Sequence, residues 1–330
     1  MLHWDEDLRV AGTGLFLDSR LPRPACFVSH AHSDHLGAHV QAFCTPETAE
    51  LAAQRIGIES VKTLPFGESF DAESDTRITL ISAGHVLGSA MIRVERPEGT
   101  LLYTGDFKLR ECLTVAPAQT LQADVLVMES TFGKPMFRFP PRQQVIDELI
   151  DRVTQAMAAG RQPVVMGYSL GKSQEIVRIL TGAGLPVTCH GAVAAINRVY
   201  ERLGTPLGPW RAYEPSDFHG RAALDLAERG VLVAPPQVAR TGFVTRFDNP
   251  LTIMLSGWGM LPGAQFRYGV NHVLPLSDHA DFDELLELIE RVQPKKIFTH
   301  HGYKEFADTL RGLGHDAQLA RKDKQLMLFE

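Results

Sequence analysis

The sequence lacks several features that would assign it quickly to a functional class. No apolar run in the 330 residues approaches the length of a membrane span, so no membrane association is expected. The first residues, MLHWDEDLR, are acidic and lack the layout of a secretory signal, so a cytoplasmic location is expected. The four cysteines form no C-x-x-C pair, which argues against a disulfide framework or a thiolate zinc site.

Positive charge is also scarce. The formal net charge is −6 with histidine neutral, which argues against a protein whose whole surface binds nucleic acid. A local basic groove is still compatible with this charge, and bound divalent cations would offset acidic ligands. The chain has no internal repeat and no low-complexity segment, and its length favours one large domain or two.

The sequence has two regions with different patterns of predicted secondary structure. The first third predicts short strands separated by turns, and Asp124–Met128 (DVLVM) has the continuous apolar character of a buried strand. From Gln143 onward strand patterns alternate with helical ones, which is typical of a parallel α/β sheet. The stretch Phe132–Arg142 (FGKPMFRFPPR) contains three prolines and is predicted to link the two regions.

The densest group of candidate metal ligands is HAHSDH, at positions 30–35. It follows a short apolar strand, so that His30 and His32 can point to the same place, and Asp34 and His35 are expected where the next helix begins. Four ligands this close in sequence do not easily surround one tetrahedral ion and divide more naturally between two neighbouring ions. Imidazole and carboxylate are the ligands that zinc or a similar divalent ion prefers.

Three further motifs supply polar residues at predicted strand ends, where the active sites of layered folds collect. SAGHVLGSA places His85 between two glycines, and LLYTGDFK places Asp106 after a strand. IFTHHGY places His300 and His301 before a glycine. A single strand-end histidine is more often structural, so the combination of these motifs is what indicates a paired metal site.

These motifs resemble the metallo-β-lactamase fold and, within it, the β-CASP nucleases. HAHSDH matches the family's H-x-H-x-D-H signature, and LFLD, GHVLGSA and TGDF look like its other metal-site motifs. The nuclease branch has three further motifs, which here are MESTFG, LSDHAD and HHG. The resemblance implies an αββα metallo-β-lactamase sandwich at residues 1–136 and 263–330, interrupted by an inserted parallel α/β β-CASP domain at residues 137–262.

Carried over residue by residue, the resemblance implies two divalent metal ions. The ligand types favour zinc, and manganese is an alternative because carboxylates share the site. One ion is expected between three histidines and the other between a carboxylate and two histidines, with a single aspartate bridging both. The implied ligands are His30, His32 and His85 for the first ion, Asp34, His35 and His301 for the second, and Asp106 for both.

The same resemblance implies a catalytic arrangement. Asp34 and Asp106 would act at the reacting centre as metal ligands, and Asp18 would orient a ligand histidine by accepting its second N–H. His279 is not a ligand and would donate a proton to the leaving oxygen, held in place by Glu129.

The segment YSLGKS, Tyr168–Ser173, resembles a turn in the family's inserted domain. A P-loop is excluded because its spacing requires glycine where Met166 stands. A helix start here could still bind a phosphate through backbone N–H groups, or it could be a plain helix start. The candidate phosphate contacts are Ser169, Lys172 and Ser173, and candidate cations for a nucleic-acid groove are Lys134, Arg138, Arg142, Arg240, Arg246 and Arg267.

The predicted function is that of a two-metal DNA exonuclease in DNA repair, acting 5′→3′ on single-stranded ends. FGKPMFRFP and LPLSDHADF look most like bacterial exonucleases associated with DNA ligase, which implies association with an ATP-dependent DNA ligase and a helicase. RNA-processing members keep the histidine that His301 represents, so an RNA endo- or exonuclease is the alternative. The Glu129 and His279 motifs and the insertion disfavour a small-molecule metallohydrolase, and the complete ligand set disfavours a binding-only module.

Overall fold

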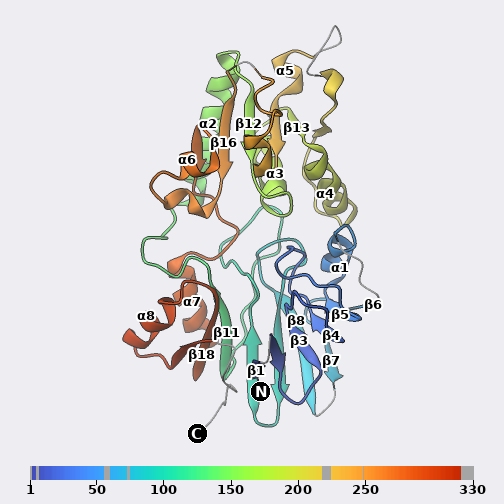
Figure 1. The fold of residues 1–330 in the computed structure, drawn as a ribbon, viewed down its shortest axis with the longest axis vertical. Helices are drawn as coiled ribbons and strands as arrows, with labels where there is room; N and C mark the ends of the chain where they lie inside the picture. Colours follow the sequence, from blue (N-terminus) through green and yellow to red (C-terminus); the bar gives the residue numbers. More distant parts are fainter. Residues whose placement is uncertain are drawn as a thin grey trace. The chain divides into compact units, whose positions relative to one another are not determined.

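The computed structural model describes residues 2–4, 7–55, 60–72, 75–217, 224–247 and 249–320, which form two compact units (Figure 1). Unit 1 consists of Met1–Phe137 and His279–Glu330, and unit 2 of Arg138–Asp278. The chain therefore returns to unit 1 at residue 279 rather than at residue 263. The reason is β17 (His272–Leu274), which pairs in parallel with β16 (Leu251–Leu255) and completes the sheet of unit 2.

The first sheet of unit 1, sheet A, is formed by the N-terminal part of the chain in the order β1-β2-β3-β4-β5-β6. Strand β2 is antiparallel to both β1 and β3, and β3 to β6 run parallel to one another. Helix α1 (Pro46–Ala52) follows β5 and is capped by Thr45, whose hydroxyl accepts the N–H of Thr48. The strands are β1 (Leu2–Trp4), β2 (Leu8–Val10), β3 (Leu15–Leu17), β4 (Ala25–Phe27), β5 (Gln41–Cys44) and β6 (Ser60–Thr63).

The second sheet of unit 1, sheet B, has the order β19-β18-β11-β10-β9-β8-β7. Strands β8, β10, β11, β18 and β19 run in the same direction, so their carboxyl ends share one edge. A turn at Pro97 and Glu98 connects β9 to β10 as a hairpin. The strands are β7 (Ser69–Ala72), β8 (Thr76–Ser82), β9 (Ala90–Arg96), β10 (Gly99–Tyr103), β11 (Val125–Ser130), β18 (Lys296–Gly302) and β19 (Ala317–Leu319).

Alternating side chains of sheet B pack on both of its faces, as β11 illustrates. Val125 and Val127 join the apolar core shared with sheet A. Leu126 and Met128 point the other way and pack with helices α7 (Phe282–Val292) and α8 (Phe306–Gly312). Each such fully buried side chain contributes roughly 1.5–3 kcal/mol, so both cores hold the strand ends of sheet B in place.

Unit 2 is a parallel α/β sheet, sheet C, with the order β14-β13-β15-β12-β16-β17, which confirms the predicted strand–helix alternation. Its other strands are β12 (Pro163–Met166), β13 (Val187–Cys189), β14 (Arg211–Ala212) and β15 (Val231–Ala234). Its helices are α2 (Arg142–Ala158), α3 (Lys172–Gly182), α4 (Gly191–Arg202), α5 (Leu226–Arg229) and α6 (Ala264–Tyr268), with 3₁₀ turns η1 (Pro215–Asp217), η2 (Pro236–Arg240) and η3 (Gly257–Met260). Within the described ranges, no helix is both long and apolar enough to cross a membrane.

The prediction of a helix beginning near Asp34 and His35 is wrong. Residues 30–40 form turns and bends that lead directly into β5. The three consecutive residues His35, Leu36 and Gly37 are all buried. This burial comes from the loop turning inward, where the backbone N–H of His35 donates to the carbonyl of His32.

Candidate metal centre

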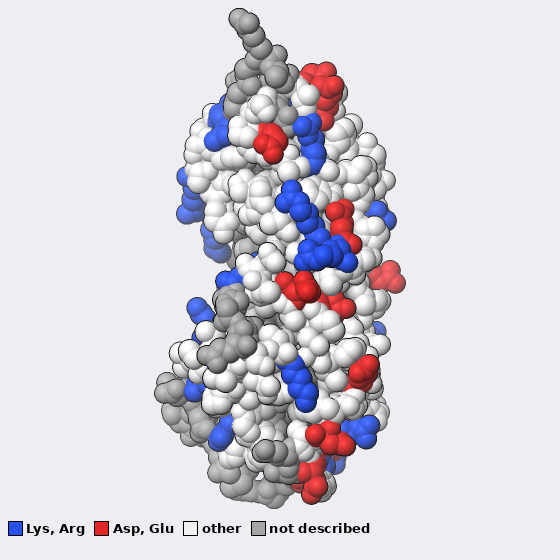
Figure 2. All heavy atoms as spheres, turned by 90° about the vertical axis from the view of Figure 1, so that its right-hand side faces the viewer, with Lys and Arg blue, Asp and Glu red and all other residues white. Residues whose placement is uncertain are grey.

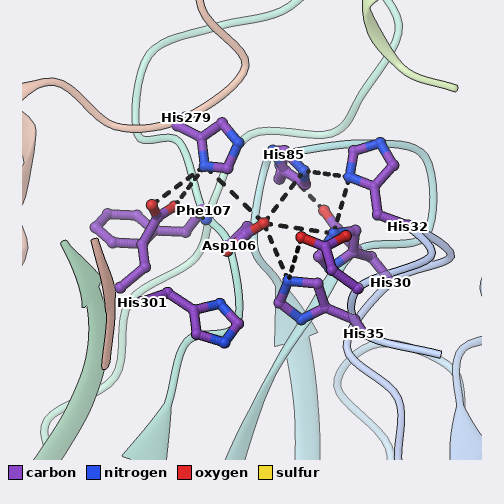
Figure 3. Close-up of polar contacts among 12 residues, drawn as sticks. His30, His32, His35, His85, Asp106, Phe107, His279 and His301 are labelled. Atoms are coloured by element: carbon purple, nitrogen blue, oxygen red, sulfur yellow. Dashed lines mark hydrogen bonds and ion pairs between the residues drawn. The ribbon is translucent and has the colours of Figure 1, made fainter. Parts of the chain in front are cut away.

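The strand ends of unit 1 bring the motif residues together (Figure 3). His30 lies just beyond β4, His85 beyond β8, Asp106 beyond β10 and His301 near the end of β18. Because β8, β10, β11 and β18 share a direction, residues widely separated in sequence meet at one edge of sheet B.

The first ligand group consists of three histidines whose ring nitrogens face one another. His32 Nδ1 lies 3.0 Å from His30 Nε2 and 3.1 Å from His85 Nε2. One ligand atom from each of these histidines and from Asp106 lies within 4.8 Å of the others. Burial and the neighbouring histidines lower the pKa of His30 well below its usual value, which favours the neutral imidazole that binds metal.

The second ligand group is formed by His35, Asp106 and His301, which also offer ligand atoms within 4.8 Å of one another. The ring centroids of His35 and His301 are 5.0 Å apart. Asp34 lies at the margin of this group. Its Oδ2 is 3.9 Å from His35 Nε2, and its side chain is 63% exposed.

Asp106 connects the two groups through a single oxygen. Its Oδ2 lies 3.3 Å from His35 Nε2, 3.5 Å from His30 Nε2 and 3.9 Å from His85 Nε2. Burial would raise the pKa of Asp106, but the adjacent histidines, His35 first, hold it well below its usual value. Asp106 is therefore an anionic ligand placed between two sets of imidazoles.

His35 presents a buried ligand atom that has no hydrogen-bond partner among the described residues. Its Nδ1 lies 2.9 Å from Asp18 Oδ2, and its Nε2 is completely buried. Burial lowers the pKa of His35, but the carboxylates of Asp106 and Asp18 outweigh burial and raise it well above its usual value. A divalent ion fits this donor set, since it would satisfy Nε2 and displace a proton from the ring.

Asp18 organises the loop that carries the histidines. Its Oδ1 accepts the backbone N–H of Ser29 at 2.7 Å, and its Oδ2 accepts the hydroxyls of Ser29 at 2.6 Å and Tyr103 at 2.8 Å. Ser29 Oγ in turn lies 2.9 Å from His30 Nδ1, so Asp18 orients one histidine directly and a second through Ser29. Sequence reasoning missed Ser29 and Tyr103. The only signal in the sequence is their position, because Ser29 and Tyr103 each lie at the end of an apolar strand pattern that comes just before a ligand motif.

Two glycines are required where the backbone passes closest to the site. Gly105 has φ +55°, and a Cβ there would lie 2.6 Å from the Cβ and Oγ of Ser29. Gly302 has φ +105°, and a Cβ there would lie 2.0 Å from the carbonyl oxygen of Ser130. Any other residue at these positions would displace Asp106 or His301.

A β-bulge decides which residue of the pair His300–His301 joins the site. His300 is paired with Glu129, Ser130 is paired with Gly302, and His301 is the extra residue between them, with φ +45°. His301 therefore turns toward His35, while the ring of His300 packs 5.2 Å from Trp4.

Glu129 and His279 form a second polar pair beside Asp106. His279 Nδ1 lies 3.1 Å from both carboxylate oxygens of Glu129 and 4.0 Å from Asp106 Oδ2. Glu129 is buried and also accepts the backbone N–H of Phe107 at 2.8 Å. The N–H of Ala280 donates to the carbonyl of Phe107 at 2.7 Å, which fixes the His279 loop to the strand end that carries Asp106.

The YSLGKS turn is internally satisfied, which favours the plain helix start over a phosphate site. Lys172 is 1% exposed, and its Nζ lies 2.8 Å from Glu175 Oε2. Ser173 is fully buried and donates its hydroxyl to the carbonyl of Gly167 at 3.0 Å. The carbonyl of Ser169 accepts from the Gln174 side chain.

Comparison with known proteins agrees with this geometry. The family described as "Zn-dependent metallo-hydrolase RNA specificity domain" matches residues 263–320. The RNase aCSPSF2 of Saccharolobus solfataricus is 31% identical over 348 residues, which covers 87% of this chain and 70% of that protein. The chain belongs to the β-CASP nucleases of the metallo-β-lactamase fold.

This β-CASP protein is also similar to part of a longer protein and to a solved structure. A "Probable DNA ligase" of Opitutus terrae is 40% identical over 318 residues, covering 96% of this chain, and the chain spans only 30% of that protein's length. A crystal structure of a protein of unknown function from Enterococcus faecalis aligns with a TM-score of 0.62 at 14% identity, covering 92% of this chain and 80% of that one. The predicted layered α/β fold is confirmed, as is the family's enzyme class of metal-dependent nucleases.

Proposed function

We propose that the chain is a two-metal phosphodiesterase that degrades DNA from an end. The position of Asp106 Oδ2 carries this proposal, because one carboxylate oxygen lies within 4.0 Å of nitrogens from four histidines that come from three separate segments of the chain. Two sets of ligands that share an anionic bridge are the arrangement expected for a two-metal phosphodiesterase. The proposed ligands are His30, His32 and His85 for one ion, Asp34, His35 and His301 for the other, and Asp106 for both.

The residues around the ligands supply orientation and a proton. When bound, two divalent ions would activate water and neutralise charge on the phosphoryl oxygens. Asp18 holds the Nδ1 proton of His35, which leaves Nε2 as its ligand atom. Glu129 accepts from Nδ1 of His279 and so leaves Nε2 as the atom that donates a proton to the leaving oxygen.

DNA is the proposed substrate, acted on in the 5′→3′ direction at single-stranded ends. The similarity to part of a probable DNA ligase supports this choice, because it covers nearly the whole of this chain at 40% identity. It also supports the proposed association with an ATP-dependent DNA ligase, with a helicase as a further proposed partner. The expected role in DNA repair and the cytoplasmic location stay predictions.

RNA is the second candidate substrate, and two observations favour it. The matched family at residues 263–320 is described as an RNA specificity domain, and the relative from Saccharolobus solfataricus is named an RNase. Both substrates fit the same metal centre, since phosphodiester hydrolysis needs the same ligands in either case.

The decisive experiment is cleavage of DNA and RNA of identical sequence, labelled at the 5′ or the 3′ end, with zinc, manganese or magnesium. We expect single-stranded DNA to lose its 5′ label first, as mononucleotides. Cleavage of RNA alone would contradict the DNA proposal and identify RNA as the substrate. Failure of the metal-loaded protein to cut either would contradict the nuclease proposal.

The role of His279 is tested in the same assay by His279→Ala, with His315→Ala as a control outside the motifs in the same unit. General acid catalysis contributes about 10²- to 10⁴-fold, so kcat should fall by that factor while two ions stay bound. Full activity of His279→Ala with intact metal content would show that the proton comes from another group.

A further inference from the structure

We propose that unit 2 carries its own binding surface for single-stranded nucleic acid at the carboxyl-end edge of sheet C. This inference rests on the proposed function, because it names where a substrate strand is held outside the metal centre. The surface is formed by residues that follow strands β14, β15 and β16 in sequence. We call it the arginine–aromatic surface and define it by Tyr213, Arg240, Phe243, Arg246, Phe266 and Arg267.

The segments that follow β15 and β16 are basic, whereas the chain as a whole is acidic and the segment after β14 contains Glu214 and Asp217. Residues 230–247 and 250–277 contain no aspartate or glutamate, although the chain carries a net charge of −6. The arginines in these segments, Arg240, Arg246 and Arg267, are exposed. Among the described residues, no carboxylate forms an ion pair with any of them.

Some other cations of unit 2 are paired with carboxylates. Arg142 and Lys172 both pair with Glu175, and Arg152 pairs with Glu148. The face shown in Figure 2, which includes α4, has basic and acidic side chains side by side. Arg161 and Arg198 of unit 2 also form no ion pair with a described carboxylate, so the arginines of this surface are distinguished by their grouping beside aromatic rings. An anion is the partner that their charge favours.

The arginine–aromatic surface lies at the edge of sheet C where parallel sheets usually bind ligands. Open α/β sheets bind ligands outside the carboxyl ends of their strands. Tyr213 directly follows β14, the segment with Arg240, Phe243 and Arg246 follows β15, and α6 with Phe266 and Arg267 follows β16 through η3. The guanidinium of Arg240 donates to the carbonyl of Arg267, which joins the segments after β15 and β16 into one surface.

Aromatic rings lie among the arginines. The Arg246 guanidinium lies 4.8 Å from the centroid of the Phe243 ring and donates to the Tyr213 hydroxyl at 2.9 Å. The Tyr213 and Phe243 rings are 5.1 Å apart. Phe266 is 81% exposed, the largest exposed fraction of any large apolar side chain described.

Arginines beside one exposed ring, Phe266, favour single strands over duplexes, while Tyr213 and Phe243 are half-buried against the core of unit 2. Unpaired bases can stack on a ring such as Phe266 while arginines contact the phosphates. Bases in a duplex are already stacked on one another, so a duplex would use the arginines alone. Covering the exposed ring of Phe266 with a base would remove apolar surface from water, which favours binding of a single strand.

The test measures binding by fluorescence anisotropy to the metal-loaded full chain carrying His279→Ala, so that the strand is not cut. The probe is an oligothymidylate of about 20 nucleotides, long enough to exceed a typical site size of roughly 4–16 nucleotides. Phe266→Ala should weaken binding about tenfold, and Phe266→Trp should restore it. Phe266→Leu, which keeps an apolar side chain without a ring, should bind like Phe266→Ala.

The arginines are tested by salt dependence. The triple variant Arg240→Gln, Arg246→Gln and Arg267→Gln should lower the slope of log K against log salt by about 2, since each phosphate contact to a single strand contributes about 0.7. The matched control is Arg198→Gln, another exposed arginine of unit 2, which lies 5.9 Å from the Trp210 ring and should leave the slope unchanged.

Three outcomes would overturn the inference. They are a triple variant with the slope of the Arg198→Gln control, a duplex bound as tightly as the single strand, and competition by polyglutamate as strong as by the oligonucleotide. The last result would assign the surface to an acidic protein partner.

Hydrolysis of bis(p-nitrophenyl) phosphate separates this inference from the proposed function, because that small ester reports on the metal centre alone. In a background that retains His279, the surface variants should hydrolyse the ester at the wild-type rate while KM for the oligonucleotide rises. A wild-type protein that cuts neither substrate refutes the nuclease proposal, and the binding readouts still decide the surface.

Discussion

Replacing Asp18 by asparagine should weaken metal binding although none of the proposed metal ligands is replaced. The Asp18 carboxylate accepts four hydrogen bonds, one at Oδ1 from the Ser29 N–H and three at Oδ2 from Ser29 Oγ, Tyr103 OH and His35 Nδ1. An asparagine of the same shape has only one accepting oxygen. One of the two sites must therefore receive an NH₂ group that faces existing donors.

The magnitude follows from these contacts. If the amide oxygen takes the Oδ2 position, the buried Ser29 N–H meets an N–H, which costs about 1–3 kcal/mol, and the three other bonds lose a charged acceptor at roughly 0.5–1 kcal/mol each. The free energy of unfolding of the metal-free protein should therefore fall by roughly 2.5–6 kcal/mol. The His35 imidazole becomes a poorer ligand, so zinc affinity should fall about 10- to 100-fold.

The assay is zinc titration against a competing chelator, together with urea unfolding of the metal-free protein. Asp124→Asn is the matched control, because Asp124 accepts three hydrogen bonds from Thr100 and Lys295 just before β11, at the opposite end of that strand from Glu129. This control should lose stability and keep zinc affinity. Equal zinc affinity of Asp18→Asn and Asp124→Asn would refute the proposed role of Asp18.

Three further predictions test other parts of the structure. Gly105→Ala should abolish metal binding, whereas Gly160→Ala, with a similar positive φ but nothing within 4 Å of its Cβ, should cost only about 1 kcal/mol of unfolding free energy; equal losses would contradict the crowding at Ser29. Lys172→Met should lower the unfolding free energy by about 3 kcal/mol and leave nucleic-acid affinity unchanged, and a selective loss of affinity would restore the phosphate site. Hydrogen bonds from Lys295 and Thr100 lower the pKa of Asp124 to about 2, so its contribution is present above about pH 4 and disappears as the pH falls toward 2. The difference in urea midpoint between wild type and Asp124→Asn should shrink over that range, and a constant difference would contradict the assignment.

Much of unit 1 could be predicted because its ligands are tied to strand ends. The apolar run Asp124–Met128 predicted β11 to within two residues, and parallel strands bring their carboxyl ends together. Motif spacing therefore predicted which residues would meet, although Asp106 and His301 are separated by nearly two hundred residues.

Several features of the structure depend on contacts that the local sequence does not show. Lys172 is buried and pairs with Glu175, which also pairs with Arg142 from another helix, and the local motif alone left both a phosphate site and a plain helix start open. The position of His301 depends on a bulge in the pairing of β11 with β18, which alternation within one strand does not reveal. The return to unit 1 at residue 279 depends on β17 pairing with β16.

The most direct test of the two-metal centre is a zinc-edge anomalous difference map of crystals of the zinc-loaded protein. The proposal predicts two peaks about 3.5–4 Å apart, one among His30, His32 and His85, the other beside His35 and His301, with Asp106 contacting both. A single peak, or two peaks that do not share Asp106, would contradict it.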